Sequence, residues 1–349
     1  MWLKSDNIAG VDPDILAALA ACNEGVADSY GNDALSLQLN ERFSLLFDKK
    51  VNVFPVCSGT AANSLGLASI AGAFSIIACH ENAHPMRNES GATTHFSGGA
   101  QFLPVTGAHG RIAASSIAKA LDSLNSDSYG AMKPSCITVT QLTEAGTAYS
   151  TEQLSEIGKL AHSRGLLLHM DGARFANAIA GRGAVPSEMT WRAGVDVLSF
   201  GGTKNGTMYA DALIFFDTEL SSEFKQRLKR AGHALSKARF LSAQLLRYLE
   251  ADKWLNNAHH ANAMAQKIGK YVERLPSAEL LHPVEGNIVF PVFTADQIKR
   301  LNAAGFFLRS KESLGDGRKI FRIVTSFQTD PSEVEKFLDV LGNSKNIFA

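Results

Sequence analysis

The fold is decided by one stretch, Val195-Asp196-Val197-Leu198-Ser199-Phe200-Gly201-Gly202-Thr203-Lys204-Asn205-Gly206. The apolar run before the glycine pair predicts a buried strand, and the two glycines let the backbone turn sharply at its carboxyl end. Lys204 stands at the tip of that turn, with no charged neighbour between Asp196 and Asp211. We therefore expect a partly desolvated lysine, whose neutral amine is the form that builds a Schiff base. By itself, a lysine in this place is more often an ordinary loop residue.

A second apolar run, residues 166–170, ends in Asp171-Gly172-Ala173-Arg174. An aspartate directly after a buried strand is well placed to pair with a pyridinium nitrogen. Pyridoxal phosphate enzymes need that pairing, because the protonated ring is what accepts electrons. The alternative is that Asp171 only caps the following helix.

A third feature is the segment Cys57-Ser58-Gly59-Thr60-Ala61-Ala62-Asn63, which follows an expected strand at 51–56 and opens a helix. Backbone amides at a helix start, with two hydroxyls beside them, form a phosphate site. In isolation an ordinary capped turn explains the segment equally well. Together, the ordered series of phosphate loop, aspartate and lysine predicts a pyridoxal phosphate site.

On these residues the chain resembles the fold-type I pyridoxal phosphate enzymes of the threonine aldolase and β-eliminating lyase family. Within it, the chain is most similar to L-phenylserine aldolases and low-specificity L-threonine aldolases. The resemblance covers nearly the whole chain and is carried by Ser5-Asp6-Asn7-Ile8-Ala9-Gly10, Tyr30-Gly31, Ser58-Gly59-Thr60-Ala61-Ala62-Asn63, His84 with Glu89-Ser90-Gly91-Ala92, His169-Met170-Asp171-Gly172-Ala173-Arg174-Phe175, Gly202-Thr203-Lys204-Asn205-Gly206 and Arg322-Ile323-Val324-Thr325.

The resemblance implies roles for cofactor-binding residues. Lys204 would hold the cofactor aldehyde, and His84 would stack on the pyridine ring with Glu89 near it. Arg230 or Arg239 would reach the cofactor phosphate of a partner subunit, although a basic run of this kind is as often a solvated helix face. The remaining expected cofactor contacts are Ser58, Gly59, Thr60, Asp171 and Thr203.

The resemblance also implies a substrate site. Arg174 and Arg322 would bind the substrate carboxylate, and Ser5 of the amino-terminal arm would approach the same group. A planar guanidinium clamp fixes which bond at the α carbon breaks. Without the resemblance, Arg322 would be read as an arginine at a strand edge.

Aldol cleavage requires a base near the β-hydroxyl group. Many threonine aldolases carry a histidine where this chain has Glu144, in Thr140-Gln141-Leu142-Thr143-Glu144-Ala145-Gly146. A glutamate in this place resembles the phenylserine aldolases. Our hypothesis is that Glu144, His84 or a water held by them takes the proton.

The composition of the chain limits which partners and metal sites are expected. The 349 residues include 34 basic and 34 acidic side chains, so neither a nucleic acid nor a membrane surface is indicated as a partner. The four cysteines are scattered without metal spacing, so no metal site is expected, and reduced thiols are the simplest interpretation. No targeting segment or membrane span is evident.

We expect a cytoplasmic enzyme with a small amino acid substrate, and the resemblance implies a homodimer or homotetramer with shared active sites.

Alternating strands and helices predict an α/β domain with a mainly parallel seven-stranded sheet. Strands are expected at 51–56, 74–79, 101–105, 136–141, 166–170, 195–200 and 210–216, the last antiparallel to its predecessor because the connection is too short for a helix. Helices are expected at 15–23, 35–47, 60–70, 113–124 and 153–162, the last opened by a Ser150 to Gln153 capping box. The expected domains are the arm with the large domain, 1–250, and a smaller α+β domain, 251–349. The latter is expected to contain a helix at 256–274, strands at 287–293, 305–309 and 320–325, and a helix at 332–341.

The resemblance thus implies a carbon-carbon lyase that splits L-threonine, L-allo-threonine or L-phenylserine into glycine and an aldehyde through a quinonoid intermediate. An aminotransferase or a β-eliminating lyase shares the same cofactor motifs. A non-catalytic cofactor-binding protein is a further alternative, but it would not need the carboxylate clamp.

Overall fold

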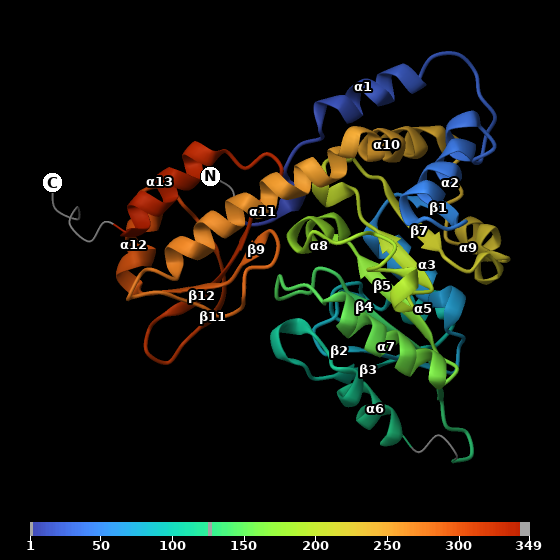
Figure 1. Cartoon of the computed structure of the whole chain (residues 1–349), viewed down its shortest axis with the longest axis horizontal. Coiled ribbons are helices and arrows are strands. Elements are labelled where there is room, and N and C mark those ends of the chain that lie inside the picture. Colours follow the sequence, from blue (N-terminus) through green and yellow to red (C-terminus); the bar gives the residue numbers. More distant parts are fainter. Residues whose placement is uncertain (1–2, 125–127, 343–349) are drawn as a thin grey trace.

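The structure, a computed structural model, describes residues 3–124 and 128–342. It has two parts, each built on its own sheet (Figure 1). The larger sheet has seven strands in the order β1-β7-β6-β5-β4-β2-β3. Their bounds are β1 Asn52–Val56, β2 Ser75–His80, β3 Gln101–Val105, β4 Lys133–Thr140, β5 Leu167–Gly172, β6 Val197–Phe200 and β7 Asp211–Phe215.

The strand directions follow the prediction. Strands β2 to β6 pair in parallel, whereas β7 runs antiparallel to both β6 and β1. Strand β1 therefore points the same way as β6. As a result, the carboxyl ends of β1, β5 and β6 lie at one edge of the sheet.

Helices cover both faces of this sheet, as expected for buried parallel strands. Helix α3 packs on one face with α5 and α9, and α2, α6, α7, α8 and α10 lie over the other (Figure 1). The predicted capping box at Ser150 and Gln153 is present at the start of α7. The helices of this part are α1 Pro13–Cys22, α2 Ala34–Phe47, α3 Gly59–Ile70, α4 His84–Arg87, α5 Ala92–Ser97, α6 Ala114–Asp122, α7 Thr151–Ser163, α8 Phe175–Arg182, α9 Phe224–Arg230 and α10 Arg239–Leu249.

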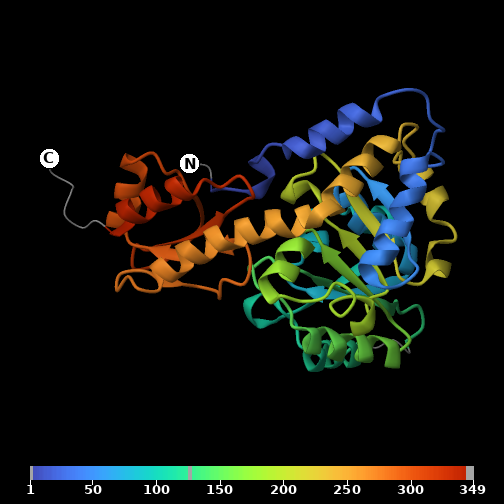
Figure 2. The ribbon, with the colours of Figure 1, turned by 45° about the horizontal axis from the view of Figure 1, so that its top comes forward.

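The smaller part follows through a long helix, α11, which runs from the large sheet to the small one (Figure 2). The small sheet has the order β11-β12-β10-β8, and β9 also pairs with β12. Helices α11 and α13 pack on it around a core that includes Phe293, Ile323 and Phe337. The bounds are α11 Lys253–Val272, β8 Glu279–Leu280, β9 Ile288–Val289, β10 Pro291–Phe293, α12 Ala295–Ala303, β11 Arg309–Ser313, β12 Lys319–Val324 and α13 Pro331–Gly342.

Two predictions in this part are wrong in detail. The strand expected at 305–309 begins only at Arg309, because Gly305 and Phe306 close helix α12. Their N–H groups donate to Asn302 and Leu301 in a left-handed helix cap at Gly305, with φ of +85°. The strand expected at 287–293 is divided into β9 and β10 at Phe290, directly before Pro291, which has no N–H to donate.

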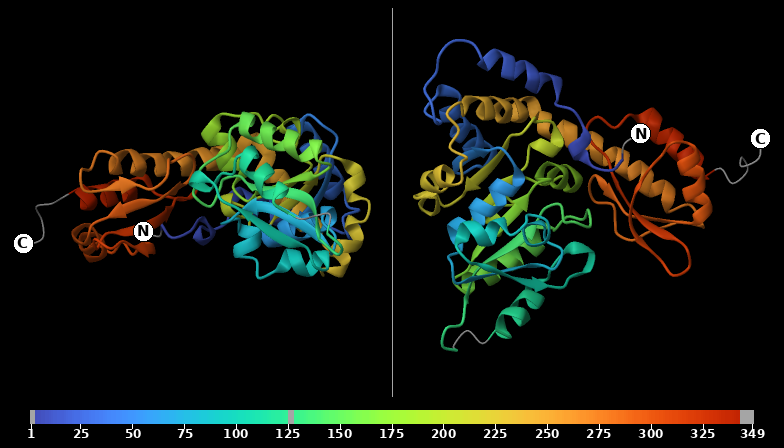
Figure 3. Two further views of the ribbon diagram at one scale, coloured as in Figure 1. Left: turned by 90° about the horizontal axis from the view of Figure 1, so that it is seen from below. Right: turned by 180° about the vertical axis from the view of Figure 1, so that it is seen from behind.

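The amino-terminal arm, residues 3–12, joins the two parts. The arm begins beside the small part, where Leu3 packs in the core, and it leads to α1, which lies over the large part (Figure 3). The backbone carbonyl of Leu3 accepts a hydrogen bond from Val324 in β12 at 2.9 Å. No helix among the described residues combines the length and apolar character needed to span a bilayer. The four cysteines are free, as expected.

Candidate active site

A cavity of about 240 Å³ lies at the edge where β1, β5 and β6 end. It brings together the three segments singled out in the sequence. The wall includes Ser58, Gly59 and Thr60 from the start of α3, Asp171 from β5, and Thr203 and Lys204 from the loop after β6. Segments far apart in the chain therefore meet as predicted, since the carboxyl ends of parallel strands share one edge.

The loop that carries Lys204 is held from two sides. A Cβ on Gly201 would lie 2.4 Å from the carbonyl oxygen of Ala173, so only glycine permits this approach of the two loops. From the other side, Asp211 Oδ1 accepts hydrogen bonds from the N–H groups of Gly202 at 2.8 Å and Thr203 at 3.0 Å. Burial raises the pKa of Asp211. Asp211 thus fixes the backbone immediately before the lysine.

The amine of Lys204 is buried, and several charged side chains act on it. Burial lowers the pKa of Lys204, and the positive charge of Arg174 acts in the same direction. The carboxylates of Asp6, Asp171 and Glu144 oppose this shift. Because the net pKa is lowered, the neutral amine is more accessible than in an ordinary surface lysine.

The start of α3 offers donors for an anion. Ser58 caps the helix, its hydroxyl accepting from the N–H of Ala61 at 3.2 Å. The N–H groups of Gly59 and Thr60 belong to the first turn, where a helix leaves them without internal partners. This is the geometry in which helix starts bind phosphate groups.

His84 stands at the start of α4, in the cavity wall. Its Nδ1 donates to Oε1 of the buried Glu89 at 2.8 Å, and this bond raises the pKa of His84. Asn63 donates to the same oxygen at 2.9 Å. Burial raises the pKa of Glu89 itself. The Nε2 atom of His84 stays available to a ligand.

The two predicted carboxylate-binding arginines lie near each other, one on each part of the chain. Burial lowers the pKa of Arg322 to about 10, and the charge of Arg174 contributes to this shift. Glu144 lies in the same electrostatic neighbourhood, because its charge acts on both arginines, Lys204 and His84. Glu144 also lines a second cleft of about 710 Å³, together with Lys311 of the small part.

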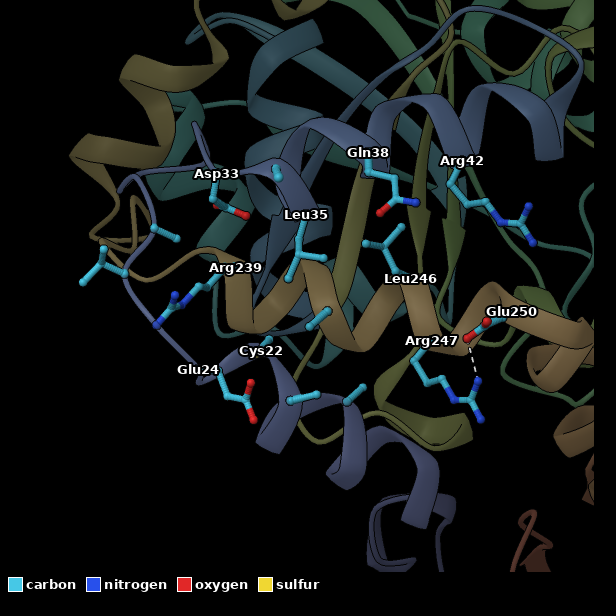
Figure 4. A pocket seen from close by; sticks show the side chains of 16 residues that line it. Cys22, Glu24, Asp33, Leu35, Gln38, Arg42, Arg239, Leu246, Arg247 and Glu250 are labelled. Atoms are coloured by element: carbon cyan, nitrogen blue, oxygen red, sulfur yellow. Dashed lines mark hydrogen bonds and ion pairs between the residues drawn. The ribbon is translucent and has the colours of Figure 1, made fainter.

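Six predicted residues do not line this cavity: Arg174, Arg322 and Glu144, described above, and Ser5, Arg230 and Arg239. The hydroxyl of Ser5 accepts a hydrogen bond from the N–H of Asn7 at 3.2 Å. Arg239 points into a groove of about 750 Å³ between α1, α2 and α10 (Figure 4). Neither Arg239 nor Arg230 lines the cavity of its own chain. Their role toward a partner's phosphate stays a prediction.

Sequence reasoning did not assign three residues of the site. Asp6 pairs with Arg174, Asp211 holds the lysine loop, and Asn63 supports Glu89. Asp6 and Asn63 belong to quoted motifs, so their presence there was a usable signal. Asp211 was visible as the first charge after Lys204, at the start of the next strand.

The donor set fits pyridoxal phosphate. Lys204 offers an amine for its aldehyde, Asp171 a carboxylate for its ring nitrogen, and the start of α3 a phosphate cradle. Asn63 Oδ1 and Glu89 Oε2 are buried in the same wall without hydrogen-bond partners among the described residues. By contrast, the described residues contain no group of three or more ligands suited to a metal ion.

Known proteins are similar to this chain over most of its length. The beta-eliminating lyase family matches residues 3–296. The chain is 38% identical to a low specificity L-threonine aldolase of Pseudomonas sp. (strain NCIMB 10558), over 95% of this chain and 94% of the relative. It is 39% identical, with the same coverage, to that of Pseudomonas aeruginosa. A solved structure of Leishmania major threonine aldolase superposes with a TM-score of 0.91 at 25% identity, covering 97% of this chain and 98% of the other.

Proposed function

The chain belongs to the beta-eliminating lyase family and is a pyridoxal phosphate-dependent carbon-carbon lyase, and from this premise we propose that it splits β-hydroxy-α-amino acids into glycine and an aldehyde. The substrates we propose are L-threonine, L-allo-threonine and L-phenylserine. The observation that carries the proposal is that Lys204 shares a cavity with Asp171 and the start of α3, while the charges of Arg174 and Glu144 act on both Lys204 and Arg322.

Pyridoxal phosphate, when bound, supplies an aldehyde for the substrate amine and a ring that takes up the electron pair of the broken bond. In this chain Lys204 would hold the aldehyde end. Asp171 would pair with the ring nitrogen, and His84 would lie against the ring face. Ser58, Gly59, Thr60 and Thr203 would hold the phosphate, with the lysine loop kept in place by Asp211.

The substrate carboxylate would bind to Arg174 and Arg322, with Ser5 nearby. Two guanidinium groups around one carboxylate orient the α carbon, so that the bond to be broken is selected by position. The side chain of Arg322 has no hydrogen bond or ion pair among the described residues, which supports its availability to a ligand.

Glu144 would accept the proton of the β-hydroxyl group, directly or through a water shared with His84. A carboxylate in this role must be ionised and lie near the reacting group. The charge of Glu144 acts on Lys204, on both arginines and on His84, which supports this assignment.

The proposal extends to the assembly and its location. We propose a cytoplasmic homodimer or homotetramer in which Arg230 or Arg239 reaches the cofactor phosphate of the neighbouring subunit. Neither Arg230 nor Arg239 lines the cavity of its own chain, which is consistent with a role in the neighbouring subunit.

The test is a product balance. The purified, cofactor-loaded protein is incubated separately with L-threonine and L-phenylserine, and glycine, aldehyde, keto acid and ammonia are measured in each sample. The proposal predicts equal amounts of glycine and aldehyde. Keto acid without free ammonia would identify an aminotransferase, and keto acid with an equal amount of ammonia and no aldehyde would identify a β-eliminating lyase. Either result would contradict the proposed reaction.

A further inference from the structure

The amino-terminal arm connects the two ends of the active site. At its start, the buried side chain of Leu3 packs in the core of the small part, and its carbonyl pairs with Val324, two residues beyond Arg322. At its end, the N–H of Asp12 donates to the carbonyl of Gly206 at 2.9 Å, two residues beyond Lys204. The arm is therefore fixed to both segments that carry the site.

Asp6 stands in the middle of this arm and is 2% exposed. Its Oδ2 accepts from Nε of Arg174 at 2.7 Å, and its Oδ1 accepts from Nη2 at 2.9 Å. This is the two-point pairing in which a carboxylate matches one edge of a guanidinium group. Asn287, from the small part, donates its Nδ2 to Oδ2 of Asp6 at 3.0 Å and to the carbonyl of Thr325 at 2.8 Å.

In the pair of Asp6 and Arg174, both side chains are charged. Although burial alone would raise the pKa of Asp6, the charge and hydrogen bonds of Arg174 hold it below its usual value, and the charge of Lys204 acts in the same direction. Asp6 is therefore a carboxylate, and Arg174 is already neutralised by it. Asp6 accepts hydrogen bonds from Nε and Nη2 of Arg174 in the large part and from Nδ2 of Asn287 in the small part, so its position depends on both parts of the chain.

The two arginines are consequently unequal. The Nε and Nη2 edge of Arg174 is occupied by Asp6, whereas its Nη1 atom has no hydrogen-bond partner among the described residues. Arg322 has no such partner among the described residues. A substrate carboxylate that enters between them meets one fixed donor edge and one uncompensated positive charge.

We infer that Asp6 is a positioning residue for the substrate carboxylate: it locks the plane of Arg174 and neutralises it, which leaves Arg322 as the charge that the substrate compensates. This inference rests on the proposed function, because it concerns the same carboxylate clamp. Since Asp6 also reaches the small part through Asn287, the clamp is assembled only when both parts are docked.

The alternative is that Asp6 competes with the substrate for Arg174. A carboxylate that already fills one edge of a guanidinium resembles a substrate carboxylate in its chemistry. The two roles predict opposite effects of removing the charge: a positioning Asp6 supports ligand binding, and a competing one opposes it.

The test compares glycine with methylamine, the same amine without the carboxylate, and follows the absorbance of the bound cofactor in the holoenzyme. For Asp6→Asn we expect the dissociation constant of glycine to rise at least tenfold, while that of methylamine stays within twofold of the wild type. Gln328→Ala is the matched control. It removes the hydrogen bond from the N–H of Gly10, another anchor of the arm, without touching Arg174. Both amines should bind to it within twofold of the wild type.

The remaining outcomes are decisive. Unchanged or tighter glycine binding by Asp6→Asn would overturn the inference while leaving the proposed function standing. Equal weakening of both amines would also overturn it, since the effect would then not concern the carboxylate. If the wild type does not prefer glycine over methylamine, the carboxylate clamp itself fails, and the inference with it.

A second variant covers the case in which Asp6→Asn does not fold, because a buried Arg174 without its partner is costly. Asn287→Ala keeps the Asp6 and Arg174 pair but removes the third donor of the carboxylate. We expect a selective weakening of glycine binding of about threefold or more, and an unchanged ratio between glycine and methylamine would overturn the inference.

Discussion

The imidazole of His84 is held by Glu89, whose Oε1 lies 2.8 Å from Nδ1 of the histidine. This bond is the largest cause of the raised pKa of His84, so replacing Glu89 by Gln should lower that pKa. An NMR titration of the imidazole, assigned with His84→Asn, measures the change. An unchanged pKa in Glu89→Gln would contradict the geometry.

The same pair predicts a pH dependence of stability. A raised histidine pKa contributes stability that is present below its unfolded value of about 6.5 and is lost as the pH rises through the folded value. Burial also raises the pKa of Glu89, so its ionised form is less favoured in the fold. Glu89→Gln should therefore lose more stability relative to the wild type at pH 6 than at pH 9. Urea unfolding at both pH values checks the sign, and a loss that grows with pH would be inconsistent with it.

Asp211 should be needed for the lysine loop. Asp211→Ala leaves the N–H groups of Gly202 and Thr203 without their acceptor, and each unsatisfied buried donor costs about 1 to 3 kcal/mol. We expect a loss of unfolding free energy of ~3 kcal/mol and weaker retention of the cofactor during dialysis. Asp211→Asn keeps one carbonyl acceptor and should lose clearly less. Equal stability of the Ala variant and the wild type would remove Asp211 from this role.

Glu144 is assigned to the β-hydroxyl proton. Glu144→Gln keeps the size of the side chain but cannot accept that proton as a carboxylate does. We expect kcat for cleavage to fall by about 10² to 10⁴, the range typical of a lost general base, with little change in KM. Steady-state kinetics with L-phenylserine measures both constants. If the cleavage rate is unchanged, Glu144 is not the base, and His84 becomes the candidate.

Arg322 should contribute to binding through its free guanidinium. Hydrogen bonds to charged groups are worth about 1.5 to 3 kcal/mol, so Arg322→Gln should raise KM by roughly 10-fold to 100-fold. Arg309→Gln is the matched control, since Arg309 lies opposite Arg322 on the neighbouring strand β11 and its side chain is exposed. Similar kinetics for the two variants would contradict a specific role of Arg322.

Much of the site followed from local sequence patterns. Strand-then-turn patterns located Lys204, Asp171 and the loop at Ser58, because each of these patterns is complete within about ten residues. The parallel sheet then placed the three at one edge, as expected for the carboxyl ends of its strands.

The parts that sequence could not supply depend on distant pairs. The bond between Asp6 and Arg174 spans 168 positions, and the bond from Asn287 to Asp6 spans 281. No periodicity links such residues, so their pairing becomes visible only in the fold. The strand expected at 305 was misplaced for a local reason, the helix cap formed by Gly305 and Phe306.

We propose that the cavity around Lys204 makes and breaks a bond between the α carbon of glycine and the carbonyl carbon of an aldehyde. The most direct measurement is the reverse reaction, in which the holoenzyme is given carbon-13 labelled glycine with acetaldehyde or benzaldehyde. NMR should then show the label in a new β-hydroxy-α-amino acid, and the Lys204→Ala variant should form none. A wild-type holoenzyme that binds glycine but forms no such product would contradict the proposed reaction.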